Sequence, residues 1–540
     1  MLDLKIIIGA VKSAAPFATR LAIDKFQRNE TVIGILKQFN LDPAHPPDDF
    51  DGVYAYTLVE YGVYKPEPIL DFFRENDVKS AFWNAFTSDP SNFLKEGEVL
   101  LKSEGLKHLE KEFQDAKVDL RLEVTEFLEI FVNVAERTKK PRDIPQGNPK
   151  IKEFLVKNSP YPEEFKSLIE GKTETFCGRN FVFTDFLQFL EKNSNGYFTV
   201  VGDAGMGKSA IAAKYVWATQ SPCYFNIRSE GRNKPELFLN SIRQQLIKRY
   251  HLQDAVDADL PTLLAKVSEK LASGEHLVIV VDALDEVEQE ERDKNLLYLP
   301  KDLPKQVYFL LTRRPYNQAR LNVSPDVPMK ELDLTDEKYT HLNREDVEKY
   351  IRLFLNTDPN HKDDLRQWIQ DRNLTDEAFV QQVAQKSENN FMYLRYVLPA
   401  IANGDYDTLQ LEELPKGLES YYQDHWVRMG MEKDDKPQVA KVIVLFILVE
   451  FGSPISCEMI AEIAEQDESE VQDVLNDWVE YLTDKEIEED TCYSFYHASF
   501  LDFLKKKKEL KSTRKLFTEV NQRIVDFYKR EMDADDAEDC

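Results

Sequence analysis

The sequence has little cysteine and no long apolar run, and each absence excludes a class of protein. The 5 cysteines among 540 residues form no C-x-x-C pair, so neither a zinc site nor a disulfide framework is indicated. Scattered reduced thiols are typical of a cytoplasmic protein. The apolar run within residues 5–12 is too short for a signal peptide, and no other stretch approaches about eighteen apolar residues. We therefore expect a cytoplasmic protein without a membrane span.

Positive charge is also scarce. Lys and Arg number 69 against 97 Asp and Glu, which gives a formal net charge of −28. This balance argues against nucleic-acid or membrane binding by bulk charge. Hydrophobic residues at 42% and charged residues at 31% are typical of a folded globular chain. The length fits about three or four domains.

A phosphate-binding motif is present at residues 202–209, which we call the phosphate loop. Its sequence, Gly-Asp-Ala-Gly-Met-Gly-Lys-Ser, fits G-x-x-x-x-G-K-[ST] at every required position. Residues 197–201 predict a buried strand before it, and residues 208–218 predict a helix after it. Glycines tolerate positive φ, so the loop can curve around an anion with its N–H groups facing the phosphates. The candidate nucleotide contacts are Gly202, Ala204, Gly205, Met206, Gly207, Lys208, Ser209 and Ala210.

Lys208 and Ser209 have distinct predicted roles. The Lys208 ammonium can reach the β- and γ-phosphates, and the Ser209 hydroxyl can hold Mg²⁺. Residues 277–282 predict an apolar strand that delivers Asp282 to its tip, where a carboxylate can complete the Mg²⁺ site. Asp285 and Glu286 follow and could polarise a water for attack on the γ-phosphate.

A further strand, residues 307–312, ends at two arginines. The second of them, Arg314, is our candidate for sensing the γ-phosphate, because an arginine at such a strand tip can pair with that charge.

Residues 1–145 predict a separate helical domain that acts as an effector or adaptor. Apolar residues recur at helical spacing through 107–134, and the turn-rich stretch 42–49 breaks the helices. We find no nucleophile elbow, nuclease cluster or Cys/His pair there. Tyr54, Tyr56, Tyr61 and Tyr64 are interpreted as core, and His45 as a surface loop residue. Residues 146–172, rich in breakers at their start, are expected to be a linker.

The motifs together resemble a known family. Residues 176–179 (Phe-Cys-Gly-Arg), the phosphate loop, residues 282–286 (Asp-Ala-Leu-Asp-Glu) and residues 312–315 (Thr-Arg-Arg-Pro) are similar to the landmarks of NACHT-type STAND P-loop NTPases. These are signal-transduction ATPases related to NOD-like receptors, and the chain most resembles the cyanobacterial branch. The resemblance implies a parallel sheet of order 5-1-4-3-2 in a NACHT core at 173–335, with ATP or ADP and Mg²⁺ as ligands and Arg179 among the nucleotide contacts.

The resemblance continues downstream. Residues 336–413 are similar to the family's helical domain, and residues 414–504 to its winged-helix domain. It implies that Pro415 packs against the adenine and that His497 contacts the ADP β-phosphate and locks the resting state. Residues 505–540 are expected to form a short charged tail, too short for the C-terminal sensing repeats of larger members.

The resemblance implies a multidomain α and α/β switch. ADP would hold it closed, and a trigger of unknown nature, such as a phage component, would permit exchange for ATP, slow hydrolysis and self-association into an oligomer. A bacterial copy would suit antiviral defence. Two alternatives stay open at this point: a constitutive ATPase motor or chaperone, and a nucleotide-binding scaffold without a switch. The intact Lys208, Asp282 and Glu286 argue against a scaffold that does not hydrolyse ATP.

Overall fold

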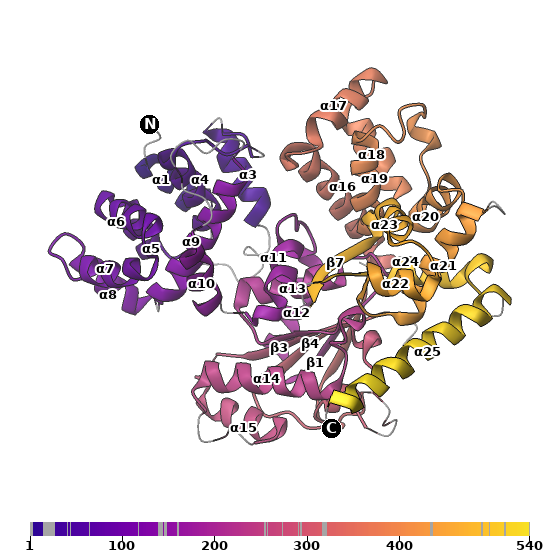
Figure 1. Cartoon of the computed structure of the whole chain (residues 1–540). Coiled ribbons are helices and arrows are strands. Elements are labelled where there is room, and N and C mark those ends of the chain that lie inside the picture. The colour runs from indigo at the N-terminus through magenta and orange to yellow at the C-terminus, as the bar shows by residue number, and fades with distance from the viewer. Residues whose placement is uncertain are drawn as a thin grey trace.

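The computed structural model describes residues 4–14, 28–39, 41–43, 45–63, 65–116, 118–138, 144, 148–158, 161–252, 255, 258–272, 274–289, 291, 294–315, 321–432, 436–487, 490–495, 497–511 and 515–538. Figure 1 shows an N-terminal group of helices on one side, a sheet with flanking helices in the centre, and two further groups of elements on the other side. Three apolar cores underlie this arrangement, and they span residues 7–155, 165–334 and 347–527.

The named elements of the N-terminal group are all helices in the part that the structure describes, as predicted. Its helices are α1 (Leu4–Ala14), α3 (Arg28–Gln38), α4 (Phe50–Gly62), α5 (Glu67–Arg74), α6 (Asn76–Thr87), α7 (Ser91–Leu101), α8 (Lys107–Asp115) and α9 (Leu120–Glu136). Aromatic rings fill the core, where Phe73 stacks on Phe127 with centroids 4.1 Å apart. Tyr54, Tyr56 and Tyr61 are fully buried, which confirms their interpretation as core. Tyr64 lies outside the described residues.

The predicted linker is largely helical. Residues 149–173 form α10 (Pro149–Asn158) and α11 (Glu163–Thr173), while residues 146–147 and 159–160 lie outside the described part. Phe165 and Ile169, four residues apart on one face of α11, are buried in the core of the central sheet domain. The breakers at the start of this segment predicted a linker, whereas the four-residue spacing of Phe165 and Ile169 indicates a helix.

The central sheet has five parallel strands in the order β2-β3-β4-β1-β5, which confirms the predicted order 5-1-4-3-2. The strands are β1 (Gly196–Val201), β2 (Cys223–Phe225), β3 (Leu277–Asp282), β4 (Val307–Arg313) and β5 (Met329–Asp333). β1, β3 and β4 are buried along their whole length, as expected for inner strands covered on both faces. Because all five are parallel, their carboxyl ends share one edge, where ligands bind in such folds.

Helices cover both faces of this sheet (Figure 1). They are α12 (Asn180–Lys192), α13 (Lys208–Thr219), α14 (Pro235–Tyr250) and α15 (Leu260–Lys270), with short 3₁₀ turns at η1 (Arg228–Glu230), η3 (Leu284–Glu286) and η4 (Leu296–Tyr298). The middle of α13, residues 211–216, is buried, and the helix contacts both β3 and β4. The helix that follows the phosphate loop is thus held rigidly against the sheet.

The remaining elements form two connected groups. The first holds η5 (Glu337–Tyr339), α16 (Thr340–Thr357), α17 (Lys362–Asp371), α18 (Asp376–Lys386), α19 (Phe391–Ala402) and η6 (Leu411–Glu413). The second holds α20 (Gly417–Arg428), α21 (Lys436–Phe451), β6 (Ile455–Ser456), α22 (Cys457–Ala464), α23 (Glu468–Asp477), η7 (Val479–Tyr481), β7 (Leu482–Ile487), β8 (Asp490–Phe495), α24 (Ala498–Lys506), η8 (Lys508–Leu510) and α25 (Lys515–Glu538). One continuous core joins the two groups.

The second group contains an antiparallel sheet of order β6-β8-β7, and α22 contacts β6 and β8. The assignment of residues 414–504 to a winged-helix domain stays a prediction. Beyond it, the expected short charged tail is instead mostly the helix α25, because Phe517, Val520 and Phe527 give it an apolar side that joins the common core.

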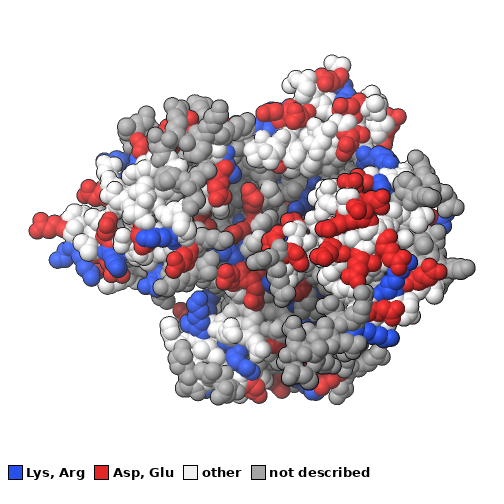
Figure 2. Space-filling view, viewed as in Figure 1, with Lys and Arg blue, Asp and Glu red and all other residues white. Residues whose placement is uncertain are grey.

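The surface agrees with the acidic composition. Figure 2 shows acidic side chains gathered over α22 and α23, whose charged residues are all acidic. Such a face lacks the basic groups that contact nucleic-acid phosphates. Among the helices that the structure describes, none is both long and apolar enough to cross a bilayer. Among the residues that the structure describes, Cys177, Cys223, Cys457 and Cys492 are buried and form no disulfide.

Candidate functional site

The phosphate loop joins β1 to α13 with the backbone that its glycines permit. Gly205 and Gly207 have φ of 82° and 85°, which L side chains rarely adopt. Lys208 lies in the first turn of α13, and its Nζ donates to the carbonyls of Gly202 and Asp203 at 2.9 and 3.0 Å. Burial lowers the pKa of Lys208, although Asp285 and Asp282 partly oppose this shift. The ammonium is therefore held inside the curve of the loop, where a phosphate charge would stabilise it.

The predicted magnesium ligands meet at the edge of the sheet. Asp282 ends β3, is 4% exposed and accepts hydrogen bonds from the side chains of Ser209 and Thr312. Burial raises the pKa of Asp282, and these two hydrogen bonds lower it. Beside it, Asn226 donates to the Asp282 carbonyl, and its own buried Oδ1 has no partner among the residues that the structure describes. The oxygen donors gathered here are of the kind that Mg²⁺ prefers.

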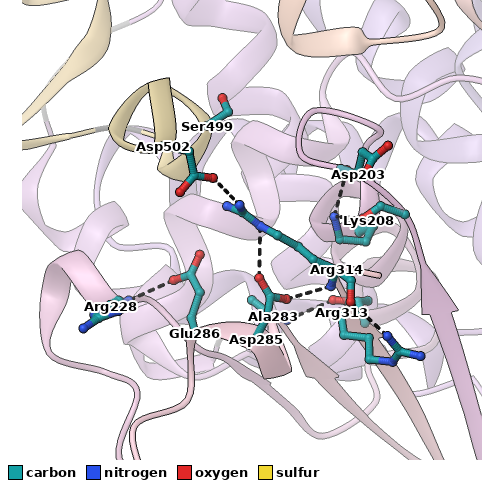
Figure 3. A network of polar contacts seen from close by, with 12 residues as sticks. Asp203, Lys208, Arg228, Ala283, Asp285, Glu286, Arg313, Arg314, Ser499 and Asp502 are labelled. Atoms are coloured by element: carbon teal, nitrogen blue, oxygen red, sulfur yellow. Dashed lines mark hydrogen bonds and ion pairs between the residues drawn. The ribbon is translucent and has the colours of Figure 1, made fainter. Parts of the chain in front are cut away.

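The two acidic residues after β3 have different surroundings. Both Asp285 oxygens bind Arg314, one through its backbone N–H at 3.0 Å and the other through Nε at 3.1 Å. Glu286 instead accepts from the Arg228 backbone N–H at 3.0 Å (Figure 3). Burial raises the pKa of Glu286 to about 7, with Asp285 and Asp282 adding to the shift. A carboxylate with this pKa can accept a proton near neutral pH, which suits Glu286 to act as the base.

Arg314 connects the site to the C-terminal elements. Its guanidinium binds Asp285 in η3 and Asp502 in α24 at the same time (Figure 3). Burial opposes the charge of Arg314, but Asp502 and Asp285 together raise its pKa. The neighbouring Arg313 turns the other way and pairs with Glu331 of β5 at 2.8 Å. Carboxylates thus hold Arg314 on both sides, and its predicted role in sensing the γ-phosphate stays a prediction.

His497 is the N-cap residue of α24. Its Nδ1 accepts the Ser499 backbone N–H at 3.1 Å, which leaves Nε2 to carry the proton of the neutral ring. Burial, together with the charges of Lys172, Arg314, Lys208 and Arg395, lowers the pKa of His497 to about 3. Basic groups from α11, α13 and α19 thus act on this imidazole together with Arg314, an arrangement that suits a polyanion.

Arg179 and the start of α19 contact the phosphate loop from outside. The buried Arg179 guanidinium donates to the Met206 carbonyl at 2.8 Å and also binds Asn343 of α16. Asn390, the N-cap of α19, donates through Nδ2 to the Ala204 carbonyl at 2.9 Å. The predicted contact of Arg179 with nucleotide stays a prediction; the contacts seen here are with the loop.

Pro415 has different surroundings from the rest of the predicted site. It lines a cavity of about 630 Å³ with residues of α20 and α24, and no phosphate-loop residue lines that cavity. Its carbonyl accepts from the Tyr393 hydroxyl at 2.6 Å. Its predicted contact with adenine stays a prediction.

Several residues of the site were missed by sequence reasoning. Asn390 carried a local signal, an N-cap residue ahead of an apolar helix, which indicates a helix start but not a contact with the loop. Asp502 gave no signal, because its partner Arg314 is 188 positions away. Thr312 stands in the family landmark at 312–315, but its bond to Asp282 and the place of Asn226 depend on the register of β4 and β2 beside β3.

Comparison with known proteins identifies two domains. Residues 3–141 match the family model of the NACHT N-terminal Helical domain 5, and residues 197–357 match that of the NACHT domain. An uncharacterized WD repeat-containing protein of Nostoc sp. is 43% identical over 145 residues, which cover 27% of this chain and 9% of that protein. The chain thus spans a small part of that relative's length.

Among solved structures, the chain is similar to a STAND protein with a tetratricopeptide repeat sensor from Pyrococcus horikoshii. The identity is 14% over 64% of this chain and 45% of the other, with a TM-score of 0.32. Thermotoga maritima RuvB shows 12% identity over 59% of this chain and 92% of its own, with a TM-score of 0.23. On the two family matches, the chain belongs to the NACHT-type P-loop NTPases and carries a NACHT N-terminal helical domain ahead of its NACHT domain.

Proposed function

We propose that the chain is a slow ATP-hydrolysing signalling switch of the cytoplasm. ADP holds it closed, and exchange for ATP after an unknown trigger opens it and permits self-association. The domain division predicted from the sequence is part of this proposal, with residues 1–145 as the effector or adaptor. The output is defence of a bacterial cell against phage, for which the support is the family resemblance of the motifs.

One observation carries the proposal: a single arginine links the nucleotide edge of the sheet to the C-terminal elements. Arg314 binds Asp285 of the NTPase core and Asp502 of α24. The γ-phosphate of ATP would offer a guanidinium a stronger anionic partner than the half-exposed Asp502 carboxylate does. ATP and the closed arrangement therefore compete for one group, and ADP, which lacks the γ-phosphate, does not compete.

The chemistry of hydrolysis is assigned to residues of the NTPase core. Ser209 and Asp282 would hold Mg²⁺, which neutralises phosphate charge when bound. Lys208 binds the phosphates, and Glu286 accepts the proton of the attacking water. In the closed arrangement both oxygens of Asp285 are committed to Arg314, so Asp285 positions the sensor arginine.

His497 supplies a second connection between α24 and the nucleotide. A neutral imidazole with its proton on Nε2 is a hydrogen-bond donor, which is what the proposed contact with the ADP β-phosphate requires. Since Nδ1 caps α24, movement of that helix would carry the donor with it. The lock then depends on the position of α24 through both His497 and Asp502.

The N-terminal helices are docked on the rest of the molecule in this arrangement. Lys362 of α17, only 9% exposed, pairs with Asp42 at 2.8 Å. Lys166 of α11 pairs with Glu129 of α9 at 2.9 Å. We infer that opening exposes part of this helical domain, and that oligomerisation raises its effective concentration so that weak self-contacts become effective.

A hydrolysis-deficient variant tests the switch against a constitutive motor. Glu286→Gln with ATP and Mg²⁺ should accumulate in the oligomeric state, because the ATP-bound form no longer decays. Size-exclusion chromatography with light scattering measures the particle mass with ADP and with ATP. A particle mass that is the same with either nucleotide would refute the switch and favour the motor.

A further inference from the structure

Three consecutive carbonyls of the phosphate loop are bound by groups outside the loop. The Ala204 carbonyl accepts from Asn390 Nδ2 and the Gly205 carbonyl from the Phe391 backbone N–H, both at 2.9 Å. The Met206 carbonyl accepts from Arg179 at 2.8 Å. Two of these three donors come from the start of α19, which is distant in sequence from the loop.

These contacts determine where the loop's N–H groups point. In a trans peptide the carbonyl of one residue and the N–H of the next point in opposite directions. Holding the carbonyls of Ala204, Gly205 and Met206 on the outside therefore turns the following N–H groups toward the inside of the loop. The Met206 N–H donates across the loop to the Asp203 carbonyl, with N and O 3.4 Å apart. Inward N–H groups are the donors that hold a phosphate.

The amide of Asn390 is fixed in orientation by two opposite requirements. Its Oδ1 accepts the Tyr393 backbone N–H at 3.1 Å as the cap of α19, and its Nδ2 donates to the Ala204 carbonyl. A Cβ at Gly205 would lie 2.3 Å from Asn390 Oδ1, so the asparagine approaches the loop as closely as a glycine allows. The Phe391 ring, in turn, lies against the Arg179 guanidinium at 4.8 Å.

We propose that Asn390 is a positioning residue for nucleotide binding, which orients the phosphate loop from α19 without contacting the nucleotide. The proposal rests on the proposed function in that the ligand is ADP or ATP. Since α19 carries Asn390 and Phe391, displacement of α19 would remove two of the three outside bonds. Nucleotide affinity and the position of α19 are therefore coupled, and by linkage each affects the other equally.

The test separates the bond to the loop from the helix cap. Asn390→Ser keeps a capping oxygen but is too short to reach the Ala204 carbonyl. Loss of one neutral hydrogen bond should weaken ADP binding about threefold to tenfold, raise the KM for ATP by a similar factor and leave kcat unchanged. Thr375→Ala, which removes the cap of the neighbouring α18, is the matched control and should lower the unfolding midpoint without changing ADP affinity.

Titration with a fluorescent ADP analogue gives the affinities. Unchanged affinity of Asn390→Ser, or a loss that Thr375→Ala reproduces, would overturn the role of Asn390. Lys208→Ala is the reference for the proposed function. If Lys208→Ala abolishes binding while Asn390→Ser binds like the unmodified protein, only this inference fails. If Lys208→Ala binds normally, the nucleotide site itself is wrong.

Discussion

Asp502→Asn should shift the protein toward its open, ATP-bound state. The substitution keeps the shape of the side chain and removes the negative charge that holds Arg314 against α24. Asp285, whose side chain is 7% exposed, would still hold the arginine at the NTPase core. The γ-phosphate then no longer competes with the Asp502 carboxylate for the guanidinium.

The expected magnitude follows from the exposure of the pair. The side chain of Asp502 is 47% exposed and that of Arg314 is 18% exposed. A fully exposed ion pair contributes about 0.2–1 kcal/mol, whereas a buried hydrogen bond to a charged group contributes about 1.5–3 kcal/mol. Because Asp502 is well solvated, we expect about 1 kcal/mol, which shifts the closed–open equilibrium about fivefold.

Size-exclusion chromatography across an ATP titration measures this shift. Asp502→Asn should form the oligomer at about fivefold lower ATP concentration than the unmodified chain. Glu419→Gln is the matched control, because Glu419 of α20 forms an exposed pair with Lys506 of α24 at 3.2 Å, so the substitution also removes an acidic partner of that helix. The reasoning fails if both variants assemble like the unmodified protein, or if both shift equally.

Three further outcomes are expected. The rate of ATP hydrolysis should decrease as the pH falls below about 7, because the Glu286 carboxylate then takes up a proton. Glu286→Gln should lower kcat about 10²-fold or more and leave ATP affinity unchanged. A coupled phosphate-release assay measures these rates. Since the pKa of His497 is lowered to about 3, only the unfolded chain takes up this proton as the pH falls from about 6.5 toward 3. Stability is lost through that range, and His497→Asn, which keeps a helix cap, should reduce the slope by up to about 1.4 kcal/mol per pH unit in denaturant titrations. Lys362→Gln removes the pair with Asp42 and should speed hydrogen exchange in α3 and α4 without changing ADP affinity. The control is Lys338→Gln, which removes the exposed pair with Asp336. Equal exchange rates in the two variants would contradict the docking role of Lys362.

The phosphate loop and the strand-tip residues could be predicted from the sequence because each lies within a short, local pattern. A strand, a glycine-rich loop and a helix specify the position of Lys208, and an apolar run delivers Asp282 to the sheet edge. The order of the strands, by contrast, came from family resemblance, since periodicity alone does not say which strands pair.

The contacts that connect the domains could not be predicted. Asp502 and Asn390 reach the site only because the chain folds back on itself over long distances in sequence. His497 was predicted as a phosphate contact, but its role as the cap of α24 depends on where that helix begins. The helices within the predicted linker were missed for a related reason: Pro149 is the first residue of α10, so this breaker marks a helix start.

The bound nucleotide and particle mass of freshly purified protein test the central claim most directly. Acid extraction followed by ion-exchange chromatography identifies the nucleotide, and light scattering gives the mass. We expect ADP in near-stoichiometric amount on a monomer, none on Lys208→Ala, and a larger particle after exchange of ADP for ATP with Mg²⁺. A nucleotide-free monomer that turns over ATP rapidly without changing its mass would contradict the switch.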